Sequence, residues 1–181
     1  EHDDPARFAL PRYWVRESDV TARLVNRWSA GWLWGYREIA RSTDDRTLVT
    51  GPIPLSAVGN KYPLLIGGPD VAVLGTALSS IVVDFIARQK IGGTSMSQFI
   101  VQQLPAPPPA VFTCRCPWDD AVAYTAWITA RALELIYTAD DMTPFARDQG
   151  DDGAPFRWDV NRRTQLRAEL DACFLHLYGL G

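Results

Sequence analysis

Residues 70–93 read DVAVLGTALSSIVVDFIARQKIGG, and this stretch decides the fold. Its apolar residues recur at spacings of three and four, which is the period of an amphipathic α-helix. Asp70 is placed to cap the first turn, and Gly92-Gly93 can end the last one. We therefore predict one helix from Asp70 to Ile91. Its apolar stripe consists of Val71, Leu74, Leu78, Ile81, Val82 and Phe85.

The residues before this helix are typical of β-strands. Residues 32–40 are rich in aromatic and branched side chains, and shorter apolar runs follow at 47–50 and 62–66. The polar cluster 41–46 predicts a turn between the first two strands. The prolines of 51–54 are expected to end the second strand, because proline cannot donate a hydrogen bond to a central ladder. The clustered tryptophans are expected to fill the core: Trp14, Trp28, Trp32 and Trp34.

The residues after the helix begin with a proline-rich spacer. Four prolines within 105–109 impose an extended backbone. Beyond the spacer, apolar periodicity predicts a helix from Trp118 toward Tyr137 and a last helix from near Asp159. The acidic, glycine-containing residues 140–153 are expected to form a mobile loop between these two helices.

Together these elements predict an α/β (α+β) fold, in which a small, mostly antiparallel sheet carries a packed helix and a C-terminal helical subdomain follows. The composition agrees with a folded globular chain, because the 181 residues are 47% hydrophobic and 22% charged with a net charge of -3. We expect a sheet-and-helix region over 1–104, a proline-rich spacer over 105–117 and a C-terminal helical region over 118–181.

Features that bear on location favour the cytoplasm. No stretch approaches the ~18 uninterrupted apolar residues of a transmembrane helix. The first residues, Glu1-His2-Asp3-Asp4, lack the basic start of a signal peptide. The chain does not begin with methionine, so we expect a piece of a longer protein. An odd number of cysteines, three, favours a reducing setting.

Several classes of enzyme are disfavoured by the motifs of the chain. Neither G-x-x-x-x-G-K-[ST] nor G-x-G-x-x-G occurs, which argues against nucleotide hydrolysis and dinucleotide binding. The two histidines, His2 and His176, lie near opposite ends of the chain and predict no Ser-His-Asp triad. Acidic pairs such as Asp119-Asp120 are typical of caps and solvated surface. We predict no catalytic residue and no metal site, and an enzyme built on an unrecognised carboxylate pair is the least favoured function.

Polar and cationic loop residues remain as candidates for a binding surface. No carboxylate occurs between Asp84 and Asp119, which predicts a local positive patch despite the acidic total. Arginine and lysine can anchor phosphates, and short polar side chains can contact base edges. From the residues alone, ordinary solvated surface is an equal alternative. The five phosphate candidates are Arg41, Arg46, Lys61, Arg88 and Lys90, and Arg37 is a further DNA-binding candidate. The candidates for base edges or backbone positioning are Ser42, Thr43, Asn60, Gln89, Thr94, Ser95 and Gln98.

Four stretches of the chain carry a resemblance to a known family. They are WGYREIARSTDDRT at 34–47, IPLSAVGN at 53–60, LSSIVVDFIARQKIGG at 78–93 and QLPAP at 103–107. In this order they resemble the region that follows the catalytic domain in bacterial type II restriction–modification DNA adenine methylases. The closing LRAELDA at 166–172 and LYGL at 177–180 are similar to the C-terminal helix of the same proteins.

The resemblance implies a DNA target-recognition region, with residues 1–104 as its recognition-like part. Its partners would be double-stranded DNA and the missing catalytic methyltransferase domain. The resemblance implies no contact with a membrane. The Asn-Pro-Pro-Tyr motif and the S-adenosylmethionine site of such enzymes are absent here, so the resemblance implies no cofactor in this fragment and no methylation by it alone. The chain has Leu78-Ser79-Ser80 where the family pattern often has Leu-Asn-Ser. The alternative is a protein–protein interaction or scaffold module of a bacterial defence complex.

Overall fold

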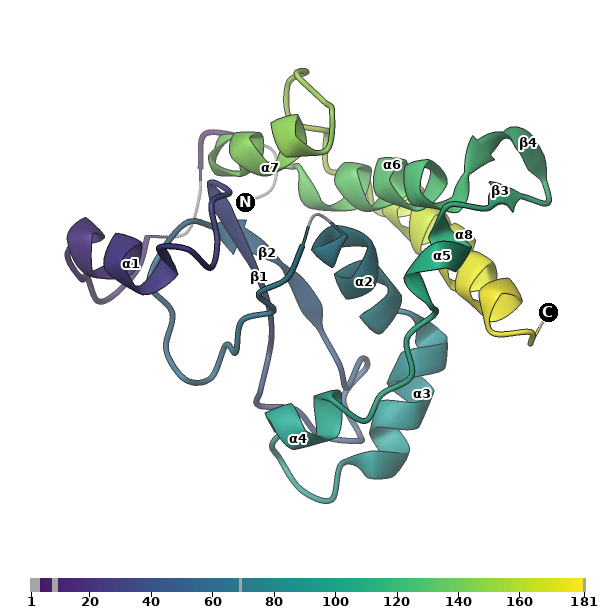
Figure 1. Ribbon diagram of the computed structural model, residues 1–181, viewed down its shortest axis with the longest axis horizontal. Helices are drawn as coiled ribbons and strands as arrows, with labels where there is room; N and C mark the ends of the chain where they lie inside the picture. The colour runs from purple at the N-terminus through teal and green to yellow at the C-terminus, as the bar shows by residue number, and fades with distance from the viewer. Residues whose placement is uncertain (1–3, 8–9, 69, 181) are drawn as a thin grey trace.

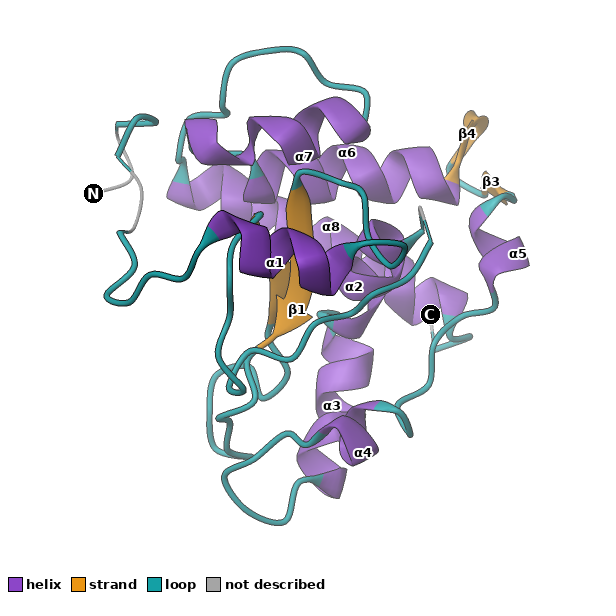
Figure 2. Ribbon diagram, turned by 60° about the vertical axis from the view of Figure 1, so that its left-hand side comes forward, coloured by secondary structure: helices purple, strands orange, loops and turns teal. Residues whose placement is uncertain are grey.

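The computed structural model describes residues 4–7, 10–68 and 70–180, and they form an α+β fold, as the sequence predicts. Helices surround a central two-stranded sheet, and a second small hairpin projects at one end (Figures 1 and 2). In chain order the elements are α1 (Glu17–Leu24), β1 (Trp32–Tyr36), β2 (Thr50–Pro54), α2 (Val71–Leu78), α3 (Ile81–Lys90), α4 (Gln98–Val101), α5 (Pro109–Phe112), β3 (Arg115–Cys116), β4 (Asp119–Ala123), α6 (Tyr124–Ile136), η1 (Asp140–Met142), α7 (Thr143–Asp148) and α8 (Val160–Leu177).

The helix predicted from Asp70 to Ile91 is wrong as a single element, because α2 and α3 meet at a bend of 64°. Ser80 adopts an extended conformation between them, and its hydroxyl accepts a hydrogen bond from the Val83 amide at the start of α3. Serine side chains that bond to the local backbone compete with helix continuation. The predicted stripe changes as a result, since Ile81 and Phe85 are exposed while Val83 is buried.

The central sheet pairs β1 with β2 in antiparallel register, and Pro52 and Pro54 lie inside β2. The prediction that these prolines end the strand is therefore wrong. They oppose Trp34 and Trp32. The backbone carbonyl of Trp34 faces the other side of β1, where it accepts a hydrogen bond from Leu65. β2 is an edge strand of this sheet. Proline is tolerated in an edge strand at positions where its missing amide hydrogen is not needed for pairing.

The third predicted strand, 62–66, forms only a bridge between Leu64 and Gly35, with hydrogen bonds to both neighbours of that glycine. The second predicted strand also shifts, because the residues before Thr50 form the end of a turn and β2 starts at Thr50. The central sheet is antiparallel as predicted, but it has two strands.

Apolar side chains from both halves of the chain form the core. All five residues of β1 are buried. The Trp32 ring packs edge-on against Phe145 of α7, with ring centroids 5.0 Å apart. α2 packs against both central strands and against α6, and α8 packs against α6 and α3. Burial confirms a core role for Trp32 and Trp34, whereas Trp14 is 76% exposed.

The C-terminal part differs from its prediction at its start and in its middle. Residues 115–123 form the β3–β4 hairpin, so α6 begins at Tyr124 and not at Trp118. The segment expected to be a loop, 140–153, contains η1 and α7, which bury Met142 and Phe145. The last helix is confirmed, and the Asp159 side chain caps it by accepting from the Arg162 amide at 2.8 Å.

No single helix in the described part of the chain is long and apolar enough to cross a membrane. α2 and α3 meet the requirements of length and composition only together, across their bend. Nearly all residues of α2 are buried within the fold.

A buried carboxylate fixes the turn that joins the two central strands. Asp84 of α3 is 2% exposed, and its Oδ1 accepts hydrogen bonds from the amides of Thr47 at 2.7 Å and Leu48 at 2.9 Å. Its Oδ2 pairs with Nε of Arg88, one turn along the helix, at 2.7 Å. A buried charge requires such partners, because an unmatched one costs several kcal/mol.

We expect D84A to lower the free energy of unfolding by about 3–5 kcal/mol, because it leaves the Arg88 guanidinium and two amides without their partner. Urea denaturation of the chain measures this loss. D152A is the matched control, since the Asp152 side chain is 92% exposed and its ion pair with Arg147 is long, at 3.8 Å. Equal stability of the D84A and D152A variants would contradict the role given to Asp84.

A second prediction concerns Gly75 of α2, which allows this helix to approach β1. A Cβ atom at Gly75 would lie 2.1 Å from Nε1 of the buried Trp34. We expect G75A to lower the free energy of unfolding by about 1–3 kcal/mol, since overpacking outweighs the gain in helix propensity. G51A should leave stability nearly unchanged, because nothing lies within 4 Å of that added Cβ. A stabilised G75A variant would contradict the close approach.

Candidate functional site

The predicted candidates Arg88 and Ser42 meet at the turn between β1 and β2. Arg88 Nη1 donates to the Ser42 carbonyl at 3.0 Å, and Nη2 donates to the carbonyl of Asp45. Its Nε is bound to Asp84. The guanidinium is thus engaged on three sides, and the side chain is 30% exposed. Arg88 holds the turn in place, and little of its hydrogen-bonding capacity is left for a ligand.

Two further candidate arginines are also held by carboxylates. Arg37 pairs with Asp44 at 2.9 Å, within the same turn. Arg46 pairs with Asp171 of α8 at 2.6 Å, across 125 positions of sequence. The other oxygen of Asp171 accepts from the Ile81 amide at 2.8 Å, so this carboxylate also caps the first turn of α3.

Glu38 collects another group of candidates just after β1. Its Oε1 accepts from Lys61 Nζ at 3.1 Å and from Ser95 Oγ at 2.8 Å. The backbone of Glu38 bonds to Lys61 on one side and to Met96 on the other. The next residues continue this pairing, because the Ala40 amide donates to the carbonyl of Thr94. Segments 38–40, 61 and 94–96 therefore lie side by side at one end of β1.

These hydrogen bonds lower the pKa of the Glu38 carboxyl. The bond from Ser95 is the main cause and the bond from Lys61 the second, and both favour the ionised form. The carboxylate is therefore the form that the fold stabilises.

The remaining candidates are exposed and are not drawn into either group. Lys90 Nζ donates to the side chain of Gln103 at 3.4 Å, and Gln98 is the first residue of α4. Arg41 is an exception through its backbone, because its amide donates to Asp44 Oδ2 at 3.2 Å and its carbonyl accepts from Thr47 Oγ1 at 3.0 Å, both within the turn. That the side chains of these candidates share one surface stays a prediction. These residues are Arg41, Thr43, Asn60, Gln89, Lys90 and Gln98.

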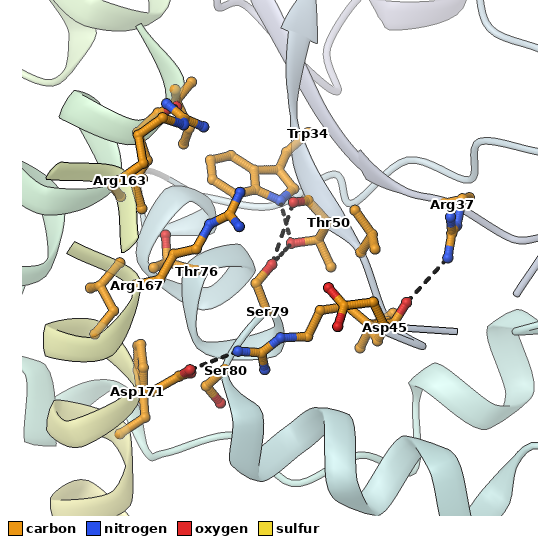
Figure 3. A pocket seen from close by; sticks show the side chains of 18 of the residues that line it. Trp34, Arg37, Asp45, Thr50, Thr76, Ser79, Ser80, Arg163, Arg167 and Asp171 are labelled. Carbon is orange, nitrogen blue, oxygen red and sulfur yellow. Dashed lines mark hydrogen bonds and ion pairs between the residues drawn. The ribbon is translucent and has the colours of Figure 1, made fainter. Parts of the chain in front are cut away.

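The structure also shows a cleft that the sequence did not predict (Figure 3). It has a volume of about 770 Å³ and lies between the turn, the α2–α3 junction and α8. We call it the arginine cleft, because Arg37, Arg46, Arg163 and Arg167 line it. Arg163 and Arg167 lie one turn apart on α8, and this spacing was the available signal. The apolar periodicity of this helix indicates only which of its residues pack against the core, and it does not point to the two arginines.

The cysteines and acidic residues form no metal centre in the described part of the chain, where no three metal-binding side chains gather. All three cysteines are free, and Cys116 and Cys173 are buried. Burial raises the pKa of the Cys173 thiol to about 12, which keeps it protonated and unreactive at neutral pH.

Comparison of the chain with protein-family models, with curated proteins and with solved structures finds no match in any of the three.

The lowered pKa of Glu38 predicts a pH dependence of stability. A carboxyl whose pKa is lower in the folded state stabilises the fold above its ordinary value of 4.5, and this contribution disappears as the pH falls through the lowered pKa. We expect the stability difference between wild type and E38Q to be largest near neutral pH and to shrink below pH 4.5. Urea titrations at several pH values measure it.

S95A tests the cause of this dependence, because it removes the main hydrogen bond and leaves the carboxyl in place. The acid-sensitive contribution should be smaller in S95A than in wild type. A difference between wild type and E38Q that is constant across the pH range would contradict the assignment.

Proposed function

We propose that this chain is a DNA target-recognition region of a type II restriction–modification N6-adenine methyltransferase, without catalytic activity of its own. The observation that supports the proposal is the contact between the two stretches that carry the resemblance most fully. Residues 34–47 and 78–93 come together through Asp84 and Arg88, which bind backbone groups of the turn. The stretches thus act as one structural unit. Such a protein would work in the cytoplasm, where bacterial DNA lies.

The ion pairs narrow the set of phosphate contacts that the proposal requires. Arg46 and Arg88 are bound to carboxylates and would have to exchange partners to reach a phosphate. Lys61 is also paired with Glu38, but its side chain is 57% exposed, so it can exchange this carboxylate for a phosphate more easily than Arg46 or Arg88 can. Arg41 and Lys90 are exposed and form no ion pair with a described residue. The proposal therefore depends on three cations and no longer on five.

S-adenosylmethionine does not fit the cleft of this chain. The cofactor is a net cation, because its sulfonium and ammonium groups outweigh its one carboxylate, whereas the cleft is lined by four arginines against three aspartates. Two of these aspartates are already paired with arginine. Methyl transfer in the proposed parent would take place in the separate catalytic domain.

The internal ion pairs favour one alternative function, a protein-interaction module of a defence complex. A surface whose positive charges are neutralised by carboxylates attracts DNA weakly, and the chain as a whole is acidic. Such a module would bind a protein subunit with little dependence on duplex DNA. The salt dependence of DNA binding separates the two functions.

We expect the chain to bind a short labelled duplex with an affinity that falls with salt. Each phosphate contact contributes about -0.9 to the slope of log K against log salt, so three contacts predict a slope of roughly -2.7. Fluorescence anisotropy at several salt concentrations measures this slope. The triple variant R41Q/K61Q/K90Q should reduce it to near zero.

R147Q is the matched control, because it removes one exposed cation from α7, outside the proposed surface. Its slope should equal that of the wild type. A wild-type chain with no salt-dependent binding would contradict DNA recognition and favour the interaction module.

A further inference from the structure

The arginine cleft is lined on opposite sides by hydroxyl groups and by guanidinium groups. On the strand side, Thr50 Oγ1 donates to the Gly75 carbonyl at 2.6 Å, lies 2.9 Å from Ser79 Oγ and accepts from Trp34 Nε1 at 3.2 Å. On the helix side, Arg167 extends from α8 toward Thr50 (Figure 3). The guanidinium groups are donors that can bind an oxyanion, whereas the Thr50 and Ser79 hydroxyls are already hydrogen-bonded within the protein.

Positive charge in the cleft exceeds what the protein itself neutralises. The pairs Arg37–Asp44 and Arg46–Asp171 account for two arginines, and Asp45 is the one remaining carboxylate among the lining residues. Arg163 and Arg167 are left. The Arg167 side chain makes no hydrogen bond or ion pair with any residue that the structure describes.

Arg163 and Arg167 also stand at a spacing that disfavours two like charges. Residues four apart on a helix are neighbours, and two cations there repel each other. Burial, and secondarily the charge of Arg167, lowers the pKa of the Arg163 guanidinium. An anion bound between these two arginines would relieve the repulsion.

Arg46 supplies an independent indication of a missing acceptor. Its Nη2 is bound to Asp171, but its Nη1 is buried and has no hydrogen-bond partner among the described residues. Buried donors in folded proteins are nearly always satisfied, so an unsatisfied one calls for an explanation. A turn of the Arg46 side chain toward the cleft would bring this donor to a ligand oxygen.

Arg163 is held ready for such a ligand. Its Nη1 donates to the Leu135 carbonyl at 2.7 Å, and its guanidinium stacks 3.6 Å above the Trp158 ring. These contacts fix the side chain before binding, which reduces the entropy that a ligand contact costs.

We propose that the arginine cleft binds a small organic phosphate, with the phosphate group placed between Arg167, Arg163 and Arg46. The planar guanidinium favours phosphate because it donates two parallel hydrogen bonds. The volume of about 770 Å³ lies within the range of small-molecule sites and exceeds the needs of inorganic phosphate, so the rest of the ligand fills the space beside the hydroxyl wall. The three cations on which DNA binding depends, Arg41, Lys61 and Lys90, do not line the cleft, so this site is independent of the proposed function.

Calorimetric titration of the chain tests the proposal with four probes: inorganic phosphate, ribose 5-phosphate, AMP and a short DNA duplex. We expect ribose 5-phosphate or AMP to bind with a Kd below about 1 mM and more tightly than inorganic phosphate. The double variant R163Q/R167Q should weaken this binding by at least about tenfold, because it removes two charge-assisted contacts. R147Q should bind as the wild type does.

A thermal melt of each variant separates loss of binding from loss of folding. Without ligand, R167Q should melt at the wild-type temperature or above it, because it removes a like-charge neighbour of Arg163. The proposal is overturned if neither organic phosphate binds, or if both bind equally well to R163Q/R167Q. It is also overturned if the duplex alone binds in an Arg163- and Arg167-dependent way, since the cleft would then hold a phosphate of the DNA backbone.

Discussion

The buried carboxylate of Asp84 is the constraint on which the shape of the N-terminal half depends. A charge that is 2% exposed must be matched locally, and the matching groups are the amides of Thr47 and Leu48 and the guanidinium of Arg88. Arg88 in turn binds two carbonyls of the same turn. Asp84 and Arg88 lie four residues apart on α3, and together they bind both amide donors and carbonyl acceptors of the turn between β1 and β2. The start of β2 follows from this, because the turn leads directly into it.

Asp171 makes the corresponding link from the C-terminal half. One of its oxygens caps α3 at Ile81, and the other binds Arg46 of the turn. The same helix, α8, carries Arg163 and Arg167. The arginine cleft therefore exists because α8 is held against the turn, and residues far apart in sequence supply its opposite sides. Apolar side chains of α8 form one cluster with those of α2 and α6, while Asp171 links α8 to α3 and to the turn.

The sequence predicted the fold class and the last helix because these depend on local signals: apolar periodicity, and a capping aspartate at Asp159. It failed where a tertiary contact overrides the local pattern. The stripe of 70–91 runs through Ser79 and Ser80 without interruption, yet Ser79 bonds to Thr50 and Ser80 caps a new helix. Likewise, proline disrupts a central strand but is tolerated in an edge strand. The sequence does not show that the strand with Pro52 lies at the edge of the sheet.

The candidate residues show the same division between local and distant information. Composition correctly placed cations and hydroxyls on the turn, but it gave no sign that Asp171 neutralises Arg46 from 125 residues away. The candidates therefore fall into two groups. Arg88 and Arg46 hold the fold, and changing them alters the turn itself. Arg41, Thr43 and Asn60 are exposed, so they can change without loss of structure. The proposed DNA recognition would use such positions, because exposed loop residues can change while the backbone that carries them stays the same.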